Sequence, residues 1–149
     1  MKSPGATATR LLVAPGMGAS AWWLPSPDFL ATSARTPASD ETYRPARALQ
    51  PGGLTHYAGG WDGQADVELP DGGYLRIAAD PVFSHLVVHR PDNLAYLCLE
   101  PVSHVADGFN LADGGMPGTG TVVLQPGESL CGSMRFVLTQ SPVSSLQSL

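Results

Sequence analysis

The residues best suited to chemistry lie in the segment LCLEPVSHVADGFN, from Leu97 to Asn110. Glu100 ends an apolar run and is followed by Pro101, and His104 comes shortly afterwards. Pro101 biases the backbone of Glu100 towards an extended conformation, so the carboxylate has a defined direction. A carboxylate in this position is solvated at a strand end, paired with another charge, or held in a pocket as a base.

The loop after Glu100 contains groups that hydrogen-bond hydroxyls, because His104, Asp107 and Asn110 follow one another around Gly108. Such groups beside a fixed carboxylate suit the recognition of a polyol such as a sugar. Any polar surface loop has a similar composition, however. For His104 alone, a surface position or a bond to the backbone is the commoner interpretation.

A second candidate segment is HYAGGWDG, from His56 to Gly63. His56 precedes a glycine-rich stretch that is able to line a cleft. Trp61 offers an apolar plane for stacking on a sugar, but a place in the core, where glycines allow the backbone to approach closely, is favoured. His85 and His89 lie on one face of a predicted strand without Cys, Asp or Glu at ligand spacing, so we expect them to face solvent and not to bind a metal.

The elements that must position these residues are predicted to be β-strands. The chain has 17 Gly and 14 Pro in 149 residues, helical periodicity is nearly absent, and most apolar runs are short. We therefore predict an all-β fold in a single β-sandwich domain over residues 1–140, followed by a flexible Ser-rich tail at 141–149. The predicted strands are residues 9–14, 21–24, 43–49, 64–69, 74–79, 84–90, 95–100, 120–124 and 129–138.

Turn sequences predict how the strands are connected. PDGG at 70–73 and RPDN at 90–93 indicate hairpins, which would join residues 64–100 into an antiparallel meander. The polar, Pro-interrupted stretch 26–45 is predicted to be a long surface loop.

Composition and charge exclude several classes of partner. The net charge is −5 and there is no basic cluster, which argues against nucleic acid and against an anionic membrane. No apolar run approaches the roughly 20 residues that span a bilayer, and no signal peptide is evident, so we expect a cytoplasmic protein.

Cys98 and Cys131 are expected to be buried free thiols. No phosphate-binding loop, dinucleotide fingerprint or G-x-S-x-G motif occurs, and we expect no cofactor.

The segment around Glu100 resembles the closing motif of the aldose 1-epimerase (galactose mutarotase) family. GGWDGQADVELPDGGYLRIAAD, HLVVHRPDNLAYLCLEP and VVLQPGESLCGSMRFVL are similar to other segments of that family and occur in the family's order. The resemblance runs over about residues 9–138 and concerns the C-terminal portion of the family only. It implies a galactose mutarotase-like antiparallel β-sandwich, present here as a partial copy.

The resemblance also implies an activity in carbohydrate metabolism, the interconversion of the α and β anomers of an aldose without metal or nucleotide. In that family a glutamate removes the proton of the anomeric hydroxyl while a histidine protonates the ring oxygen. Glu100 matches the base. The sugar is then expected to bind among Thr55, His56, His104 and Asn110.

Two departures from the family pattern leave alternatives open. No His-Pro-Tyr-Phe sequence, which carries the family's acid histidine, occurs in the chain, and Thr55 stands where the family has an aspartate. His56 and His104 are the expected substitutes for the acid. The alternative functions are a non-catalytic carbohydrate-binding or structural β-domain, or a truncated gene product. Because a partial sandwich exposes strand edges, we expect a homo-oligomer or an association with a missing N-terminal half.

Overall fold

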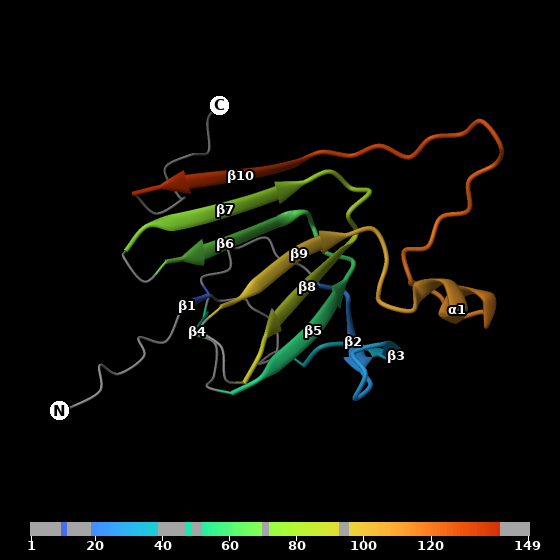
Figure 1. The fold of residues 1–149 in the computed structure, drawn as a ribbon, viewed down its shortest axis with the longest axis horizontal. Helices are drawn as coiled ribbons and strands as arrows, with labels where there is room; N and C mark the ends of the chain where they lie inside the picture. Colours follow the sequence, from blue (N-terminus) through green and yellow to red (C-terminus); the bar gives the residue numbers. More distant parts are fainter. Residues whose placement is uncertain are drawn as a thin grey trace.

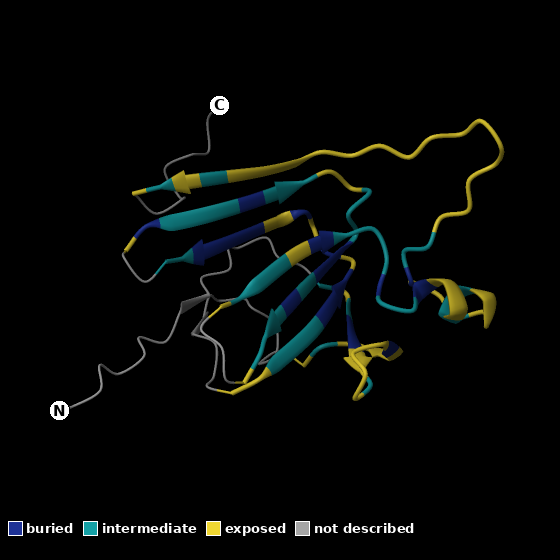
Figure 2. Ribbon diagram, in the orientation of Figure 1, coloured by how far each residue is buried: buried dark blue, intermediate teal, exposed yellow. Residues whose placement is uncertain are grey.

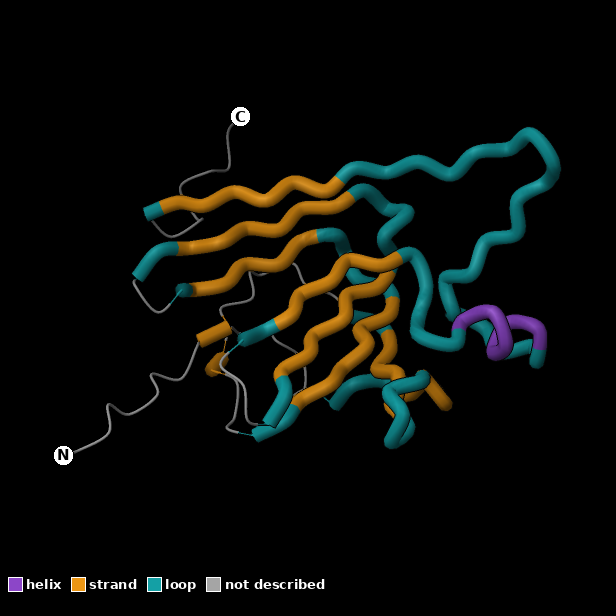
Figure 3. The backbone as a smooth tube through the Cα atoms, viewed as in Figure 1, coloured by secondary structure: helices purple, strands orange, loops and turns teal. Residues whose placement is uncertain are grey.

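The computed structural model describes residues 10–11, 19–38, 47–48, 52–69, 72–92 and 96–140. Its architecture is an antiparallel β-sandwich, with ten strands and a single short helix among the described residues and a long loop before the last strand (Figure 1, Figure 3). The predicted all-β class is therefore confirmed. The tail at 141–149 lies outside the described residues.

The larger sheet has five strands in the order β3-β2-β5-β8-β9, all paired antiparallel with their neighbours. Its strands are β2 (Ala21–Pro25), β3 (Ala31–Arg35), β5 (Leu54–Gly59), β8 (His85–Arg90) and β9 (Cys98–Val102). The apolar residues of β5 and β8 place this pair in the interior of the sheet, where each strand has a paired neighbour on both sides.

The smaller sheet has three strands in the order β10-β7-β6. These strands are β6 (Gln64–Glu68), β7 (Tyr74–Ala79) and β10 (Met134–Thr139). A separate ribbon pairs β1 (Arg10–Leu11) with β4 (Arg47–Ala48). The short helix α1 (Gly108–Asp113) lies beyond the end of β9, at the side of the sandwich (Figure 1).

The main core lies between the two sheets and contains apolar side chains from both. Its buried members are Trp22, Ala58, Trp61, Ala65, Val67, Ile77, Leu86 and Val88. A second, smaller core lies on the other face of the five-stranded sheet, where Trp23, Ala31 and Tyr57 pack against Val105 of the segment that leads into α1. This segment covers only part of that face, and the rest is open.

Several predicted elements differ from the observed ones. Ala31–Arg35 is a strand inside the predicted long loop, Leu54–Gly59 was not predicted as a strand, and Gly108–Asp113 is helical. Residues 120–124 and 129–133 were predicted as strand and are not, because they have no partner strand in the described part of the chain. The strand predictions at 74–79 and, to within a residue, at 21–24, 64–69 and 84–90 are confirmed. Of the predicted strands 9–14 and 43–49, only the residues of β1 and β4 are described.

The predicted meander is wrong at one connection. β6 pairs with β7, and β8 pairs with β9, as expected for hairpins, but β7 and β8 belong to different sheets. The turn between them is held at Asp80, whose carboxylate accepts a hydrogen bond from the Ser133 amide at 2.8 Å and whose carbonyl accepts one from the Phe83 amide at 2.9 Å. The chain therefore crosses the core here instead of turning back within one sheet.

Large apolar side chains are left exposed along β10 and along the connection that precedes it, and Figure 2 shows both segments as largely exposed. Met134, Phe136 and Leu138 lie on one face of β10, and they are 40%, 58% and 72% exposed. Val122, Val123, Leu124 and Leu130 of the preceding connection are exposed as well. The sheet thus presents large apolar side chains that nothing in the described residues covers.

The expectation that both cysteines are buried is wrong. Cys98 is half-buried on β9, and Cys131 is exposed in the connection before β10, because this connection has no partner strand. Both are free thiols. Among the described residues, no helix has the length and apolar character needed to cross a membrane.

Candidate functional site

The register of three neighbouring strands brings the candidate residues to one face of the larger sheet. Thr55 of β5 lies opposite His89 of β8, and Tyr57 lies opposite Val87. Val87 in turn lies opposite Glu100 of β9. Because side chains alternate along a strand, all five point to the same side, away from the main core.

This face forms the floor of an open cavity of about 450 Å³. Such a volume lies within the range of small-molecule sites. The cavity walls come from the β2–β3 hairpin and from the segment after β9. The lining residues are Phe29, Thr55, Tyr57, Val87, His89, Glu100, Val102, His104, Val105 and Ala106.

Glu100 is exposed at this cavity, and its orientation is as predicted from strand alternation. The neighbouring Leu97 and Leu99 pack against the main core, and Pro101 is buried. The carboxylate affects two groups around it. Burial raises the pKa of the Tyr57 hydroxyl, and the negative charge of Glu100 raises it further. The pKa of the Cys98 thiol is raised by burial first and by Glu100 second. Glu100 is thus an accessible carboxylate and not a desolvated one.

His89 lies beside Glu100 on the same face and is held on two sides. Its Nδ1 is 2.9 Å from the hydroxyl oxygen of Thr55. The ring of Phe29 meets the imidazole edge-on, with centroids 5.6 Å apart and an interplanar angle of 82°. The expectation that His89 simply faces solvent is therefore wrong, since it is half-buried at the cavity.

Phe29 is positioned by a strained turn. Its φ of 62° is in the left-handed region, which is unusual for a bulky residue and costs on the order of 1–3 kcal/mol. The turn is closed by hydrogen bonds between Ser26 and Leu30, and the Tyr57 hydroxyl donates to the carbonyl oxygen of Phe29. Tyr57 therefore ties the tip of the β2–β3 hairpin to the floor of the cavity.

His104 reaches the cavity from the loop after β9. Its Nδ1 lies 2.9 Å from the Ser103 hydroxyl oxygen, and its ring packs against Phe109 with centroids 4.8 Å apart. The loop is anchored by the Val105 amide, which donates to the carbonyl of Thr119 at 3.0 Å. His104 is thus placed by its neighbours in sequence and not by the sheet.

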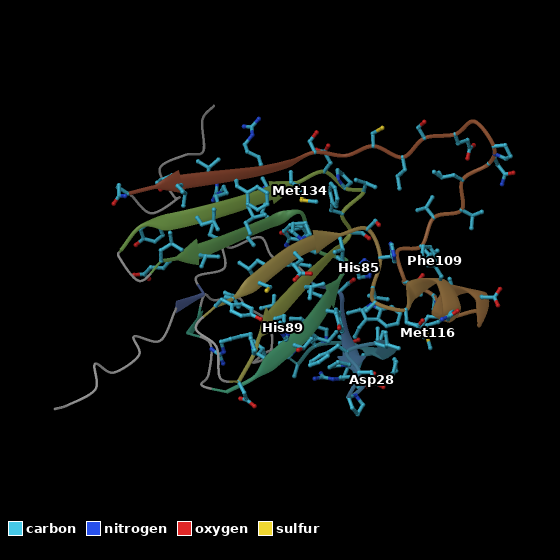
Figure 4. All side chains as sticks on the ribbon, in the orientation of Figure 1. Asp28, His85, His89, Phe109, Met116 and Met134 are labelled. Atoms are coloured by element: carbon cyan, nitrogen blue, oxygen red, sulfur yellow. The ribbon has the colours of Figure 1, made fainter. Side chains whose placement is uncertain are left out.

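His85 lies on the same face of β8 as His89, outside the cavity lining, and is only 3% exposed (Figure 4). Its Nε2 donates to the Gly118 carbonyl at 3.0 Å, so Nδ1, 2.9 Å from the Ser84 hydroxyl, is the acceptor in the neutral ring. Burial lowers the pKa of His85, outweighing its hydrogen bonds to the backbone. The expectation of a solvent-facing His85 is wrong, because the segment 116–121 covers it. No group of three or more metal-ligating side chains occurs among the described residues.

The structure brings together three of the five residues singled out from the sequence, namely Glu100, Thr55 and His104. It does not bring His56 to the cavity, because alternation along β5 turns that ring to the opposite face, where it packs 4.8 Å from Trp22. Asn110 is exposed on α1 and donates to Asp107. Trp61 is in the main core, as favoured from the sequence, and its Nε1 donates to the Gln64 carbonyl at 2.9 Å.

Sequence reasoning did not assign Phe29, Tyr57 or His89 to a binding site, although all three line the cavity. The signal for two of them was present. An alternating strand at LTHYAG would have placed Thr55 and Tyr57 on one face, and pairing with HLVVHR would have added His89. Nothing in the sequence indicated the turn at Phe29.

Comparison with known proteins supports the fold. No protein-family model matches the chain, and no curated protein matches it by sequence. A solved structure with a similar fold is that of an Escherichia coli K12 protein described as a "putative aldose 1-epimerase". The TM-score is 0.70 at 24% identity, and the match covers 89% of this chain but 46% of that one. The antiparallel β-sandwich expected from the sequence is thereby confirmed, and this chain spans about half the length of that neighbour.

Proposed function

We propose that the chain binds an aldose in the cavity over β5, β8 and β9 and interconverts its α and β anomers, as an aldose 1-epimerase-like isomerase. The observation that carries the proposal is the position of Glu100, an accessible carboxylate on the floor of a cavity that also holds two imidazoles. The structural neighbour is described as a "putative aldose 1-epimerase", which agrees with this proposed activity.

Glu100 is the proposed base. It removes the proton of the anomeric hydroxyl, the electron pair forms the carbonyl at C1, and the bond from C1 to the ring oxygen breaks as that oxygen takes up a proton. Rotation about the C1–C2 bond and reclosure then give either anomer. A positioned base contributes typically about 10²–10⁴-fold to such a step.

The cavity lining suits a neutral sugar, which has both hydroxyl groups and an apolar C–H face. Thr55 and His104 supply hydrogen-bonding groups at the cavity, while Phe29, Val87 and Val102 supply apolar surface. His56 and Asn110 have no part in this proposal, because neither lines the cavity.

Polarimetry of freshly dissolved α-glucose and α-galactose tests the proposal. The wild-type chain should accelerate the approach to equilibrium above the buffer rate, and Glu100→Gln should lose about 10²–10⁴-fold of that acceleration. Glu68→Gln is the matched control, since Glu68 is on β6 of the other sheet. Acceleration that survives unchanged in Glu100→Gln would reject Glu100 as the base.

The second candidate is a non-catalytic carbohydrate-binding β-domain. It is favoured by the coverage, because the chain spans only 46% of its structural neighbour and contains no His-Pro-Tyr-Phe sequence. Titration calorimetry with the same sugars separates the two candidates. Binding without any acceleration of anomer exchange would support the second.

We also propose that a second copy of the chain covers the apolar face of β10, an edge strand of its sheet. Antiparallel pairing of two β10 strands centred on Phe136 sets Met134 against Leu138 of the partner subunit and Arg135 against Val137 of the partner subunit. Like charges do not meet in this register, and the apolar faces become continuous.

Sedimentation velocity tests this association. The wild type should sediment as a dimer and Phe136→Lys as a monomer, whereas a monomeric wild type would overturn the proposal. The cytoplasmic location and the absence of nucleic-acid and membrane partners stay predictions.

A further inference from the structure

We propose that His89 is the general acid of this site, donating a proton from Nε2 to the ring oxygen of the sugar, with Thr55 as the residue that positions it. The inference rests on the proposed function. It assigns the acid role, for which the sequence offered only His56 and His104, to a histidine that strand register brings beside the base.

The placement of His89 relative to Glu100 fits an acid–base pair. His89 is opposite Cys98 on β9, and Glu100 is the next residue on the same face. Diagonal neighbours of this kind have Cα atoms roughly 7–8 Å apart, and their side chains reach one another's surroundings. The anomeric hydroxyl and the ring oxygen are both attached to C1, so a base and an acid on one face of two adjacent strands are able to reach both from one side.

The imidazole is oriented before any substrate arrives. Thr55 lies 2.9 Å from Nδ1, and Phe29 packs edge-on against the ring at 5.6 Å. A hydroxyl oxygen is able to accept the Nδ1 proton, which leaves Nε2 as the nitrogen that gains and loses a proton. In the described part of the chain no hydrogen bond occupies Nε2, and the ring borders the cavity.

The protons balance over one cycle. The imidazolium of His89 gives its Nε2 proton to the ring oxygen as the bond from that oxygen to C1 breaks, and Glu100 takes the proton of the anomeric hydroxyl. The open-chain sugar then faces a neutral His89 and a protonated Glu100. On reclosure Nε2 takes back the proton of the C5 hydroxyl, and Glu100 returns its proton to the new anomeric oxygen.

The other histidines are less suited to this role. The Nε2 of His85 is committed to the Gly118 carbonyl, and the ring is buried. His56 is on the opposite face of the sheet. His104 borders the cavity, but it lies in the loop after β9 and packs against the exposed Phe109, so neither the sheet nor a second strand fixes its ring.

Chemical rescue distinguishes an acid from a structural residue. His89→Ala should lower kcat for anomer exchange by about 10²–10⁴-fold, and added imidazole, which fits the space vacated in the cavity, should restore part of kcat after the rate with imidazole alone is subtracted. His104→Ala is the matched comparison. It should raise KM for the sugar, and imidazole should not increase its kcat.

Variants of Thr55 give a second measurement. Thr55→Val keeps the shape of the side chain but removes the hydroxyl that orients His89, so kcat should fall by a larger factor than KM rises, and Thr55→Ser should restore both. Each variant is checked for unchanged far-ultraviolet circular dichroism.

The outcomes separate the acid assignment from the proposed function. An active wild type and an inactive Glu100→Gln would support the proposed function. If His89→Ala then keeps the wild-type kcat, or if its lower kcat does not respond to imidazole, the assignment of His89 is overturned while the proposed function stands. If His104→Ala alone shows the imidazole response, His104 is the acid instead. A wild type without activity removes the proposed function and this assignment together.

Discussion

Replacing Gly120 by Ala should destabilise the fold and disturb the loop that carries His104. Gly120 has a φ of 78°, and a Cβ added there would lie 2.1 Å from the carbonyl oxygen of Ser103 and 2.8 Å from the ring of His85. The left-handed conformation costs an L-residue about 1–2 kcal/mol. Forcing apart well-packed atoms adds typically about 1–3 kcal/mol, and here the close atom is backbone, which yields least. We therefore expect Gly120→Ala to lower the free energy of unfolding by about 2–5 kcal/mol, a large part of the 5–15 kcal/mol typical of a domain.

Gly127→Ala is the control, because Gly127 has a φ of 92° and no atom within 4 Å of the added Cβ. It should cost no more than the backbone strain, about 1–2 kcal/mol. Urea unfolding followed by tryptophan fluorescence measures both variants. Gly120→Ala should also show slower anomer exchange, since Ser103 precedes His104. Equal destabilisation by the two substitutions would refute the reasoning that the close approach to Ser103 matters.

Two further predictions concern ionisation. Because burial lowers the pKa of His85, the unfolded chain takes up a proton at this residue before the folded one as the pH falls. The contribution of His85 to the free energy of unfolding should therefore be complete above pH about 6.5, and it should decrease as the pH falls through that value towards the lowered pKa. Urea unfolding between pH 5 and pH 8 measures this effect. The His85→Gln variant should lack the part of the pH dependence that comes from His85. Burial and the Glu100 charge raise the pKa of Cys98, so iodoacetamide at pH 8 should label the exposed Cys131 faster, and Glu100→Gln should accelerate labelling of Cys98 only. Identical Cys98 labelling rates in the wild type and Glu100→Gln would show that the carboxylate does not act on the thiol.

The strands that could be predicted are those whose pattern matches their surroundings. Tyr74–Ala79 is bounded by turn residues and follows β6 directly, so local sequence suffices. Ala31–Arg35 was missed because it is an edge strand with only Ala31 buried, and its sequence ATSAR has no apolar alternation. GTVVL at 120–124 has high β-propensity but finds no partner strand in the described residues, and propensity alone does not make a strand.

The site could be predicted only in part for a similar reason. The direction of Glu100 followed from Pro101 and from alternation with Leu97 and Leu99, which are local features. The proposed role of His89 depends on the register between β5, β8 and β9, in which Thr55 meets His89 from 34 positions away. Without β5 recognised as a strand, neither Thr55 nor His89 could be placed beside the carboxylate.

The most direct test of the account is the exchange rate between the α and β anomers at equilibrium, measured by NMR exchange spectroscopy on glucose and galactose with catalytic amounts of the chain. The account predicts exchange above the buffer rate for the wild type and for Glu68→Gln, and a rate lower by about 10²–10⁴-fold for Glu100→Gln. Exchange at the buffer rate with the folded wild-type chain would contradict it.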